Sequence, residues 1–344
     1  MTQEQWNTLL KVLAGEPVRP VPAGFIIDSP WLPPWMGMSI LDYYASESMW
    51  LEANFKAMRR FPQAIFLPGF WSEYGMCTEP SAFGAKSVWQ ESELPFADKT
   101  LNYEQPFGET PRPNPSTDGL LPFTLRRLVH ARGEIEKAGH AIRFAVCRGP
   151  LNIASFLLGA TEFMISIKEK PEECHALLNT ITDFLVEWLR LQKEAIPTID
   201  GIFALDDLVG FLGREDFAAF AKPYVTRVFG AFPATVRFFH NDAAGLITAP
   251  HLHEMGINLF NFSFNHSLAQ MRQLAGPEVT LLGNVPPRDV MATGTPEAVR
   301  RAVLDSVAGL TDRRRVILSV GGGMSPGTST ENIEAFLDAA GTIV

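Results

Sequence analysis

The stretch Val236-Arg-Phe-Phe-His-Asn-Asp242 joins a short apolar, aromatic run to three polar residues. A buried strand that leaves the core at an active site has this pattern, because its last side chains then face a ligand. His240, Asn241 and Asp242 can each bind a proton, a metal ion or a hydrogen-bonding ligand. Two simpler interpretations stay open: His240 is a core histidine, and Asn241-Asp242 caps a helix that starts at Ala243.

Seven further apolar runs are predicted to be strands, and at least one helix separates each strand from the next. The eight predicted strands span residues 21–28, 64–70, 141–147, 201–205, 235–240, 258–263, 279–283 and 316–320. Strands that alternate strictly with helices pack in parallel, and eight repeats predict a closed (β/α)8 TIM barrel. A doubly wound open sheet is the alternative fold. Gly321-Gly-Gly323 is not a dinucleotide-binding motif, since it lacks the GxGxxG spacing.

Ten helices are predicted from apolar residues at helical spacing and from their end signals. They span residues 2–14, 39–60, 123–138, 152–167, 171–195, 214–230, 244–255, 267–275, 296–309 and 329–340. Residues 90–125 interrupt the alternation with many prolines. Long connections of this kind tend to be lids, binding loops or linkers, and a lid or interface insertion within one domain spanning 1–344 is expected.

The composition is that of a globular protein, with 344 residues, 46% hydrophobic and 19% charged. A formal net charge of -9 argues against nucleic acid, an anionic membrane or a heavily anionic substrate as partner. Cys77, Cys147 and Cys174 form no CxxC pair, so a reducing, cytoplasmic location is expected. The sequence contains neither an export signal nor an apolar run long enough to span a membrane.

Polar residues gather where the predicted strands end. In a barrel these carboxyl ends surround one mouth, which is where chemistry takes place. The residues at these ends are Asp28, Glu73, Arg148, Asp206, Asp207, His240, Asp242, His266 and Asn284. We predict catalytic roles for His240, Asp242, Glu73 and Asp206. Predicted substrate-binding residues are Asp28, Trp31, Trp71, Cys77, Arg148, Asp207, Asn241, His266, Asn284 and Met324.

From residue 9 onward the chain resembles the uroporphyrinogen decarboxylase superfamily, in particular its corrinoid-dependent methyltransferase branch. The order and spacing of several stretches carry the resemblance. They lie at residues 9–18, 78–86, 149–159, 206–207, 215–217, 222–224, 240–242, 283–287, 294–299 and 321–332. The resemblance implies a (β/α)8 barrel, in agreement with the strand count.

The decarboxylase pattern is incomplete in this chain. The resemblance implies arginines after the first strand, an aspartate after the second and a histidine in the last glycine loop. Here the first loop reads Asp28-Ser-Pro-Trp31-Leu-Pro-Pro-Trp35, the second strand ends Leu67-Pro-Gly-Phe70, and the last loop is Gly321-Gly-Gly-Met324. An unpaired acid that faces a substrate with eight carboxylates is unfavourable. Decarboxylation of a porphyrinogen is therefore not expected.

The methyltransferase branch moves a methyl group between a small molecule and the cobalt of a corrinoid on a separate protein. Tryptophans could line a mouth for the flat corrin, and loop packing or a homodimer interface is the alternative role for them. These residues are Trp31, Trp35, Trp71 and Trp89. Thiol-methylating members bind zinc through His-x-Cys and a later Cys. This chain has His240, Asp242 and Gly322 at those positions, so a zinc site for thiol activation is not expected.

Loss of the thiolates fits the opposite half-reaction, in which a methyl group leaves an ether or amine for cobalt(I). The leaving group then needs a proton or a Lewis acid. His240 with Asp242, or Glu73, could supply the proton. Zinc is the alternative, bound by His240, Asp242 and one further acid. The candidates for that acid are Glu73, Glu79, Asp206 and Asp207, with Cys77 as a possible fourth ligand.

The sequence thus predicts a methyltransferase that demethylates a small substrate, such as an aromatic methyl ether, and passes the methyl group to a corrinoid protein. Two alternatives stay open. The first is a decarboxylase that acts on a substrate other than uroporphyrinogen. The second is a non-catalytic protein that binds a corrinoid or another small ligand.

Overall fold

Eight parallel strands form the centre of the molecule, which is a computed structural model that describes residues 1–27, 30–243 and 246–344. Six of them form one sheet in the order β10-β9-β8-β7-β6-β5, and β1 pairs with β2. Bridges from Ala23 to Leu318 and from Ile26 to Gly323 join β1 to the β10 edge. The strands are β1 (Gly24–Ile26), β2 (Ile65–Leu67), β5 (Phe144–Arg148), β6 (Gly201–Leu205), β7 (Val236–Asn241), β8 (Leu259–Phe262), β9 (Thr280–Val285) and β10 (Val316–Val320). The predicted (β/α)8 barrel is confirmed.

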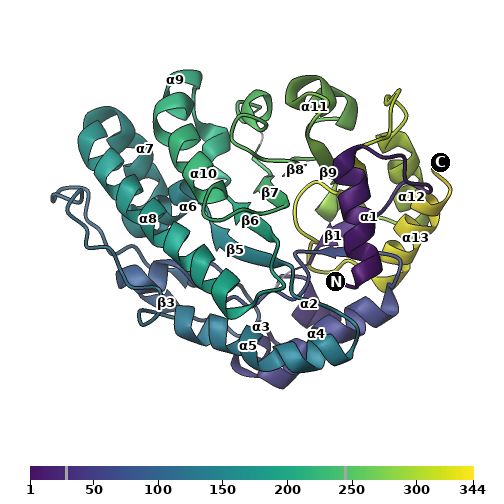
Figure 1. Ribbon diagram of the computed structural model, residues 1–344, viewed down its shortest axis with the longest axis horizontal. Coiled ribbons are helices and arrows are strands. Elements are labelled where there is room, and N and C mark those ends of the chain that lie inside the picture. Colours follow the sequence, from purple (N-terminus) through teal and green to yellow (C-terminus); the bar gives the residue numbers. More distant parts are fainter. Residues whose placement is uncertain (28–29, 244–245) are drawn as a thin grey trace.

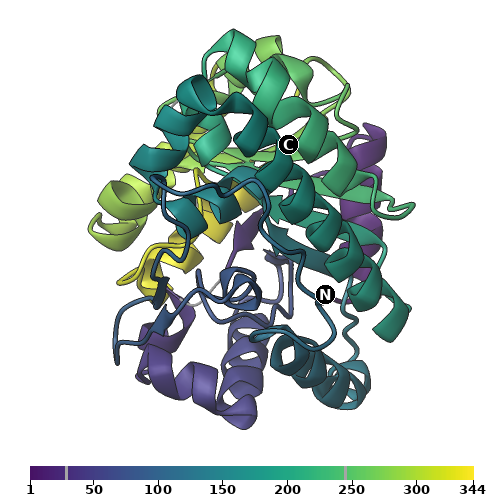
Figure 2. The same ribbon diagram turned by 90° about the vertical axis from the view of Figure 1, so that its left-hand side faces the viewer.

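The helices lie outside the strands (Figure 1). They are α1 (Gln3–Ala14), α2 (Leu32–Trp35), α3 (Ile40–Ala45), α4 (Glu47–Arg60), α5 (Leu121–Lys137), α6 (Pro150–Leu158), α7 (Ala160–Glu169), α8 (Pro171–Ala195), α9 (Arg214–Asp216), α10 (Lys222–Phe229), α11 (Leu268–Ala275), α12 (Pro296–Ser306) and α13 (Thr330–Gly341). Figure 2 shows α3, α4 and α5 together at one side of the molecule, below the strands. Each strand therefore has helical cover, as parallel sheets require.

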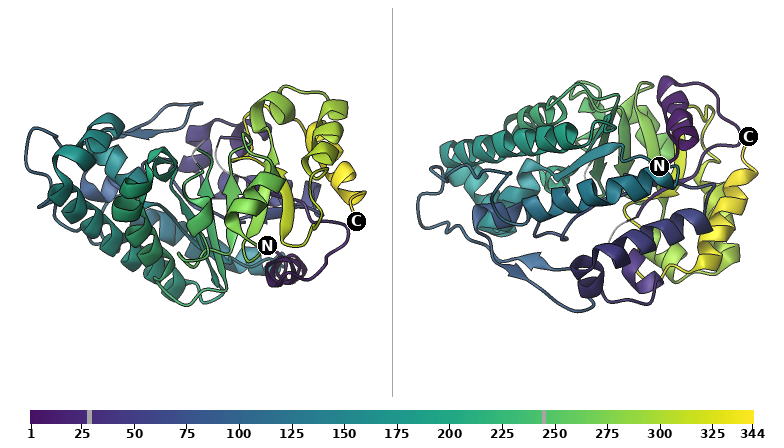
Figure 3. Two further views of the ribbon diagram at one scale, coloured as in Figure 1. Left: turned by 90° about the horizontal axis from the view of Figure 1, so that it is seen from above. Right: turned by 60° about the horizontal axis from the view of Figure 1, so that its bottom comes forward.

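Helix α1 closes the amino-terminal end of the barrel. Its predicted apolar face, which includes Trp6 and Leu9, belongs to the same buried cluster as the interior strand residues Phe144 and Val236. The Trp6 ring meets the Phe144 ring edge to face, with centroids 5.8 Å apart. Full burial of one such side chain contributes about 1.5–3 kcal/mol. Figure 3 shows α1 beside the strands, with both termini at the surface nearby.

Alternation along the strands sets which side chains face the barrel interior. Val236 and Phe238 lie in the interior cluster, so the period of two also directs His240 inward. By the same two-residue period, Asn261 also faces the interior, two residues after Leu259. Arg148 does so as well, two residues after Val146. The interior is thus apolar at its closed end and polar at its carboxyl end.

Three predicted helices are interrupted or shortened, and the predicted helix 214–230 contains a π-helical segment, Phe217–Ala221, between α9 and α10. The predicted helix 39–60 is two helices, because Ser46 interrupts it and its hydroxyl accepts from Met49 N at the start of α4. The predicted helix 152–167 breaks at Gly159, whose φ is 100°. The predicted helix 244–255 contains only the short η4 (Ala249–His251) among its described residues, since Pro250 removes a backbone donor there.

A hairpin opens the long insertion between β2 and β5. β3 (Ser87–Val88) and β4 (Phe96–Ala97) pair antiparallel, and the chain then runs irregularly to α5. Among the residues between these two strands, Leu94 lines the barrel mouth. Among the described residues no single helix is long and apolar enough to cross a membrane; α6 and α7 reach that length only as a pair bent by 105°.

Candidate active site

A cavity of about 410 Å³ opens at the carboxyl ends of the strands. Its size falls within the range of small-molecule sites. Seven predicted site residues line it: Trp71, Glu73, Arg148, Asp207, His240, Asp242 and Met324. The other lining residues are Pro30, Gly75, Met76, Leu94, Asn152, Phe156, Leu205, Leu208, Gly323, Ser325 and Pro326. A few ionisable groups therefore face largely apolar walls.

Asn261 fixes the orientation of the His240 ring. Its amide nitrogen donates to the carbonyls of Leu282 and Val320, at 2.9 and 3.0 Å. The amide oxygen is then the atom that faces His240 Nδ1, 2.8 Å away. Because this oxygen only accepts, Nδ1 carries a proton and donates it. In the neutral ring, Nε2 has a free lone pair.

This Nε2 atom faces two carboxylates. It lies 3.8 Å from Asp207 Oδ1 and 4.0 Å from Asp242 Oδ2, both beyond hydrogen-bond range. One ligand atom from each of the three residues can be chosen so that all lie within 4.8 Å of one another. With zinc–ligand distances of about 2.0–2.2 Å, two ligands of a tetrahedral site lie about 3.4 Å apart. The donor set and spacing fit a divalent ion with an open position for a ligand.

The surroundings of Asp242 complete this cluster. A Cβ atom added at Gly322 would meet Asp242 Oδ2 at 2.9 Å. Gly322 is the position where the resemblance implied a cysteine, and it does face the cluster. Asp207, which was one of four candidate acids, completes the set of donors from a second segment, the one that follows β6. Burial raises the pKa of Asp207, attraction to His240 lowers it, and repulsion from Asp242 raises it again.

Arg148 is the cation in the described lining, and two buried glutamates hold it. Its Nη2 lies 2.9 Å from Glu73 Oε2 and its Nη1 lies 3.4 Å from Glu79 Oε2. The backbone N–H of Arg148 donates to Glu79 Oε1 as well. Burial lowers the pKa of Arg148, but attraction to the two carboxylates outweighs it and raises the pKa above its ordinary value. Its charge is therefore already neutralised.

Asp206 lies behind the cavity. Its carboxylate accepts from the backbone N–H groups of Leu151 and Asn152 at the start of α6, at 2.9 and 3.1 Å. Burial raises the pKa of Asp206 well above its ordinary value, although these hydrogen bonds lower it. A Cβ atom at Gly149 would lie 2.3 Å from Asp206 Oδ2, so glycine permits this close approach. These contacts favour a helix-capping role, and the predicted catalytic role stays a prediction.

The remaining predicted residues that the structure describes do not line the cavity. Trp31 is buried and donates from Nε1 to the Thr328 carbonyl. Cys77 is fully buried, and burial raises the pKa of its thiol. Asn241 accepts from Ala243 N at 3.1 Å, and Asn284 donates to the His266 carbonyl. Asp28 lies outside the described residues.

Sequence reasoning missed several residues of the site. Asn261 was overlooked because it lies inside a strand; the alternation that directs Leu259 inward would have identified it. Asn152 and Phe156 line the cavity from one face of α6, at the i, i+4 spacing of a helix. No pattern in the sequence around Leu94 indicates that it lines the cavity.

The family model for uroporphyrinogen decarboxylase (URO-D) matches residues 5–343. The chain belongs to this family. The methylated-thiol–coenzyme M methyltransferase of Methanosarcina mazei is 24% identical over 270 residues, which cover 78% of this chain and 70% of the relative. The uroporphyrinogen decarboxylase of Xylella fastidiosa is 25% identical over 304 residues, which cover 84% and 82%. That of Prochlorococcus marinus is 27% identical over 180 residues, and the match spans about half of each protein.

Solved structures agree on the fold. A methyltransferase from Methanosarcina mazei has a TM-score of 0.80 at 19% identity and covers 98% of both chains. A B12-independent methionine synthase from Shewanella sp. has a TM-score of 0.59 at 10% identity. The family thus contains proteins named as decarboxylases and one named as a methyltransferase, so membership establishes the fold and leaves the reaction to the site.

Proposed function

We propose that this chain is a corrinoid-dependent methyltransferase that removes a methyl group from a small substrate, an aromatic methyl ether, and passes it to the cobalt of a corrinoid protein. The observation that carries the proposal is the cluster of His240 Nε2, Asp207 and Asp242 in a cavity with apolar walls. The likeness to a methyltransferase along most of the chain supports it.

The alternative within the family, decarboxylation of uroporphyrinogen, fits the cavity poorly. A substrate with eight carboxylates needs free cations around it. Among the described lining residues, the cation is Arg148, and Glu73 and Glu79 neutralise it. Asp207 and Asp242 add further negative charge, so a polyanion would be repelled.

The reaction transfers a methyl cation equivalent. Cobalt(I), on the partner protein, attacks the methyl carbon and supplies both electrons of the new carbon–cobalt bond, which oxidises it to cobalt(III). The ether carbon–oxygen bond breaks, and its electron pair stays on oxygen. That oxygen takes a proton and leaves as an alcohol or phenol. The protein's part is to position the ether and to assist the departing oxygen.

The His240 cluster can give this assistance in two ways. As an imidazolium, His240 donates its Nε2 proton to the oxygen, and Asp207 and Asp242 stabilise the positive ring. General acid catalysis of this kind is typically worth about 10²–10⁴-fold. Alternatively, Asp207, His240 and Asp242 hold a divalent ion such as zinc, which when bound supplies a Lewis acid. In both cases Asn261 keeps Nε2 directed towards the carboxylates.

The test is anaerobic mixing of the purified protein with cob(I)alamin and a panel of methoxyaromatics, methylamines and methyl thioethers. Visible spectroscopy then follows formation of methylcobalamin. We expect formation with a methoxyaromatic donor, and loss of at least about 100-fold in rate for His240→Ala. His253→Ala, at an exposed histidine outside the cavity, is the matched control and should keep the wild-type rate.

Three results would contradict the proposal. Methyl transfer from no donor, by folded protein, would favour the decarboxylase or the binding protein. Absence of turnover in the wild type, together with weaker donor binding by His240→Ala, would favour the binding protein. Equal rates for His240→Ala and wild type would remove the cluster from the reaction. Metal analysis of the active protein separates the two forms of assistance.

A further inference from the structure

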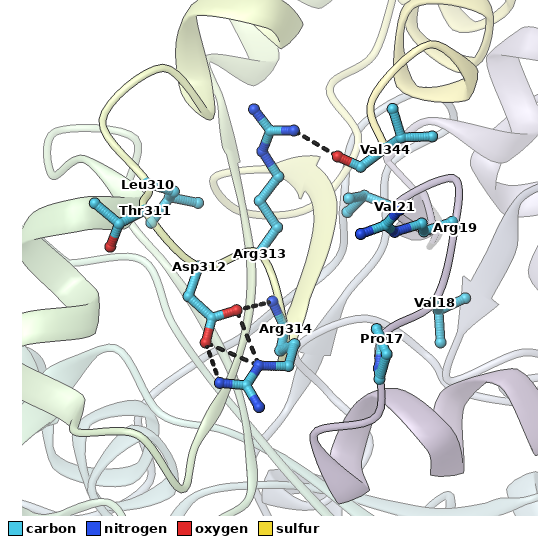
Figure 4. Close-up of a pocket in the computed structure, with 10 residues that line it drawn as sticks. All are labelled: Pro17, Val18, Arg19, Val21, Leu310, Thr311, Asp312, Arg313, Arg314 and Val344. Carbon is cyan, nitrogen blue, oxygen red and sulfur yellow. Dashed lines mark hydrogen bonds and ion pairs between the residues drawn. The ribbon is translucent and has the colours of Figure 1, made fainter.

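A second hollow lies at the opposite end of the barrel from the cavity. Figure 4 shows the side chains that line it. Three parts of the chain form it: residues 17–21, which precede β1, residues 310–314, which precede β10, and Val344, which follows α13. Its volume is about 370 Å³. The lining residues are Pro17, Val18, Arg19, Val21, Leu310, Thr311, Asp312, Arg313, Arg314 and Val344. Because it adjoins the amino ends of the strands, a ligand here cannot reach the His240 cluster.

Asp312 is the acid of this hollow, and Arg314 neutralises it. Arg314 Nη2 lies 2.7 Å and Nε 2.9 Å from Asp312 Oδ2, and the Arg314 backbone N–H donates to Oδ1. The hydrogen bonds from Arg314 lower the pKa of Asp312. Both carboxylate oxygens of Asp312 therefore accept hydrogen bonds from Arg314.

Arg19 and Arg313 are the other two basic residues of the hollow. Arg313 Nη1 donates to the main-chain oxygen of Val344 at 2.6 Å, which leaves its other donors open. Within residues 1–27, 30–243 and 246–344, no Asp or Glu side chain pairs with Arg19 or Arg313. Figure 4 shows the Arg19 side chain extending from its own loop towards the loop that carries Arg313. Two arginine side chains thus share one hollow without an acidic side chain of their own.

The neighbouring surface adds to this positive field. Across the Arg314–Asp312 pair, an adjoining hollow contains Arg272, Arg315 and Glu278. Arg315 lies 3.6 Å from Glu278, while Arg272 donates to main-chain carbonyls only. The face therefore has three arginines more than acids, on a chain whose formal net charge is -9. Such a local excess attracts anions that the rest of the surface repels.

We propose that the hollow at Arg19 and Arg313 is a binding site for a small organic phosphate. The planar guanidinium group matches the oxygens of a phosphate with two parallel N–H donors, and two such groups can hold one phosphate. The apolar side chains of Pro17, Val18 and Leu310 form the rest of the wall and contact the organic part. The site does not depend on the methyl-transfer reaction.

Binding here stabilises the native state, because the site unites two loops that are about 290 residues apart in sequence. A ligand that binds only the folded chain raises its stability in proportion to the logarithm of ligand concentration over Kd. Both loops precede barrel strands. A bound ligand would therefore stabilise the amino-terminal end of the barrel, where β1 and β10 are joined by single bridges.

Isothermal titration calorimetry at low ionic strength tests the site, with AMP as the organic phosphate and inorganic phosphate and adenosine as its two parts. We expect saturable binding of AMP that is at least about tenfold tighter than binding of either part. The double variant Arg19→Gln, Arg313→Gln should weaken AMP binding by about tenfold or more. Circular dichroism checks that the variant is folded.

The matched control removes two positive charges elsewhere, with Arg126→Gln and Arg132→Gln on α5, which lies away from the hollow in Figure 1. The control should change the AMP Kd by less than about twofold. An equal loss of affinity in both double variants would overturn the site, because net charge alone would then explain binding. Absence of saturable AMP binding to the wild type, or equal affinity for inorganic phosphate, would overturn it too.

Discussion

His240 Nδ1 lies 2.8 Å from the amide oxygen of Asn261, and this contact determines which ring nitrogen faces the cavity. The two residues come from adjacent strands at directly paired positions, β7 to β8. Asn261 also joins β8 to the carbonyls of Leu282 and Val320 on β9 and β10. A single side chain, Asn261, thus links His240 on β7 to β8, β9 and β10.

Replacement of Asn261 by Leu should weaken metal binding by the His240 cluster by about 10–100-fold, because the ring loses the acceptor that sets its tautomer. It should also cost about 1–3 kcal/mol in the free energy of unfolding, since two buried carbonyls lose their donor. Zinc titration and urea unfolding measure the two effects. Asn265→Leu, at an exposed position, serves as the control and should alter neither. An unchanged zinc affinity in Asn261→Leu would exclude the proposed orienting role.

Replacement of Gly322 by Ala should disturb Asp242. The φ of Gly322 is 133°, and the added Cβ would lie 2.9 Å from Asp242 Oδ2. Gly327 offers a matched control, because its φ is 84° and a Cβ added there would meet no atom within 4 Å. Both alanine variants should lose about 1–3 kcal/mol of stability from backbone strain. Only Gly322→Ala should lower zinc affinity or methyl-transfer rate; equal effects in both variants would show that the contact with Asp242 does not matter.

Replacement of Arg148 by Met should destabilise the fold by about 3–5 kcal/mol, since Glu73 and Glu79 would remain buried without a cation. Chemical denaturation at neutral pH measures the loss. The triple variant that also carries Glu73→Gln and Glu79→Gln should recover much of it, because no uncompensated charge then remains. If the triple variant is as unstable as Arg148→Met, the packing of the Arg148 side chain, and not its charge, accounts for the lost stability.

The sequence predicted the barrel, and half of the predicted site residues line the cavity, for one physical reason. Strand ends are marked by a change from apolar to polar residues, and in a parallel barrel those ends converge, so residues from distant segments such as Glu73, Arg148 and His240 were expected together and do line one cavity. Asp206 and Asp207 are adjacent in sequence, so this rule could not predict which of the two carboxylates faces the cavity. The backbone turn between them directs one carboxylate to the α6 amino end and the other to the cavity.

Other features depend on packing that no local pattern records. Trp31 was predicted to line the mouth, with loop packing or an interface as the alternative; it stacks on Trp35 and is buried against the loop before α13. Leu94 reaches the cavity only because the β3–β4 hairpin folds over it. Arg19 and Arg313 meet because the first and last strands of a closed barrel are neighbours, which the strand count implies but the spacing of the residues does not.

Acid should destabilise the protein through His140. Burial lowers the pKa of this histidine from 6.5 to about 4, and it packs against the rings of Phe55 and Phe70. The unfolded chain therefore binds the proton more readily than the native state, so this contribution to stability is complete above pH 6.5 and is lost as the pH falls towards 4. The loss amounts to at most about 3 kcal/mol. Urea unfolding of wild type and His140→Gln between pH 4 and 7 measures this loss, because the free energy of unfolding should fall less steeply with decreasing pH in the variant. The exposed-site variant His253→Gln should keep the wild-type pH dependence. Identical pH profiles for wild type and His140→Gln would show that the buried ring is not the source of the acid sensitivity.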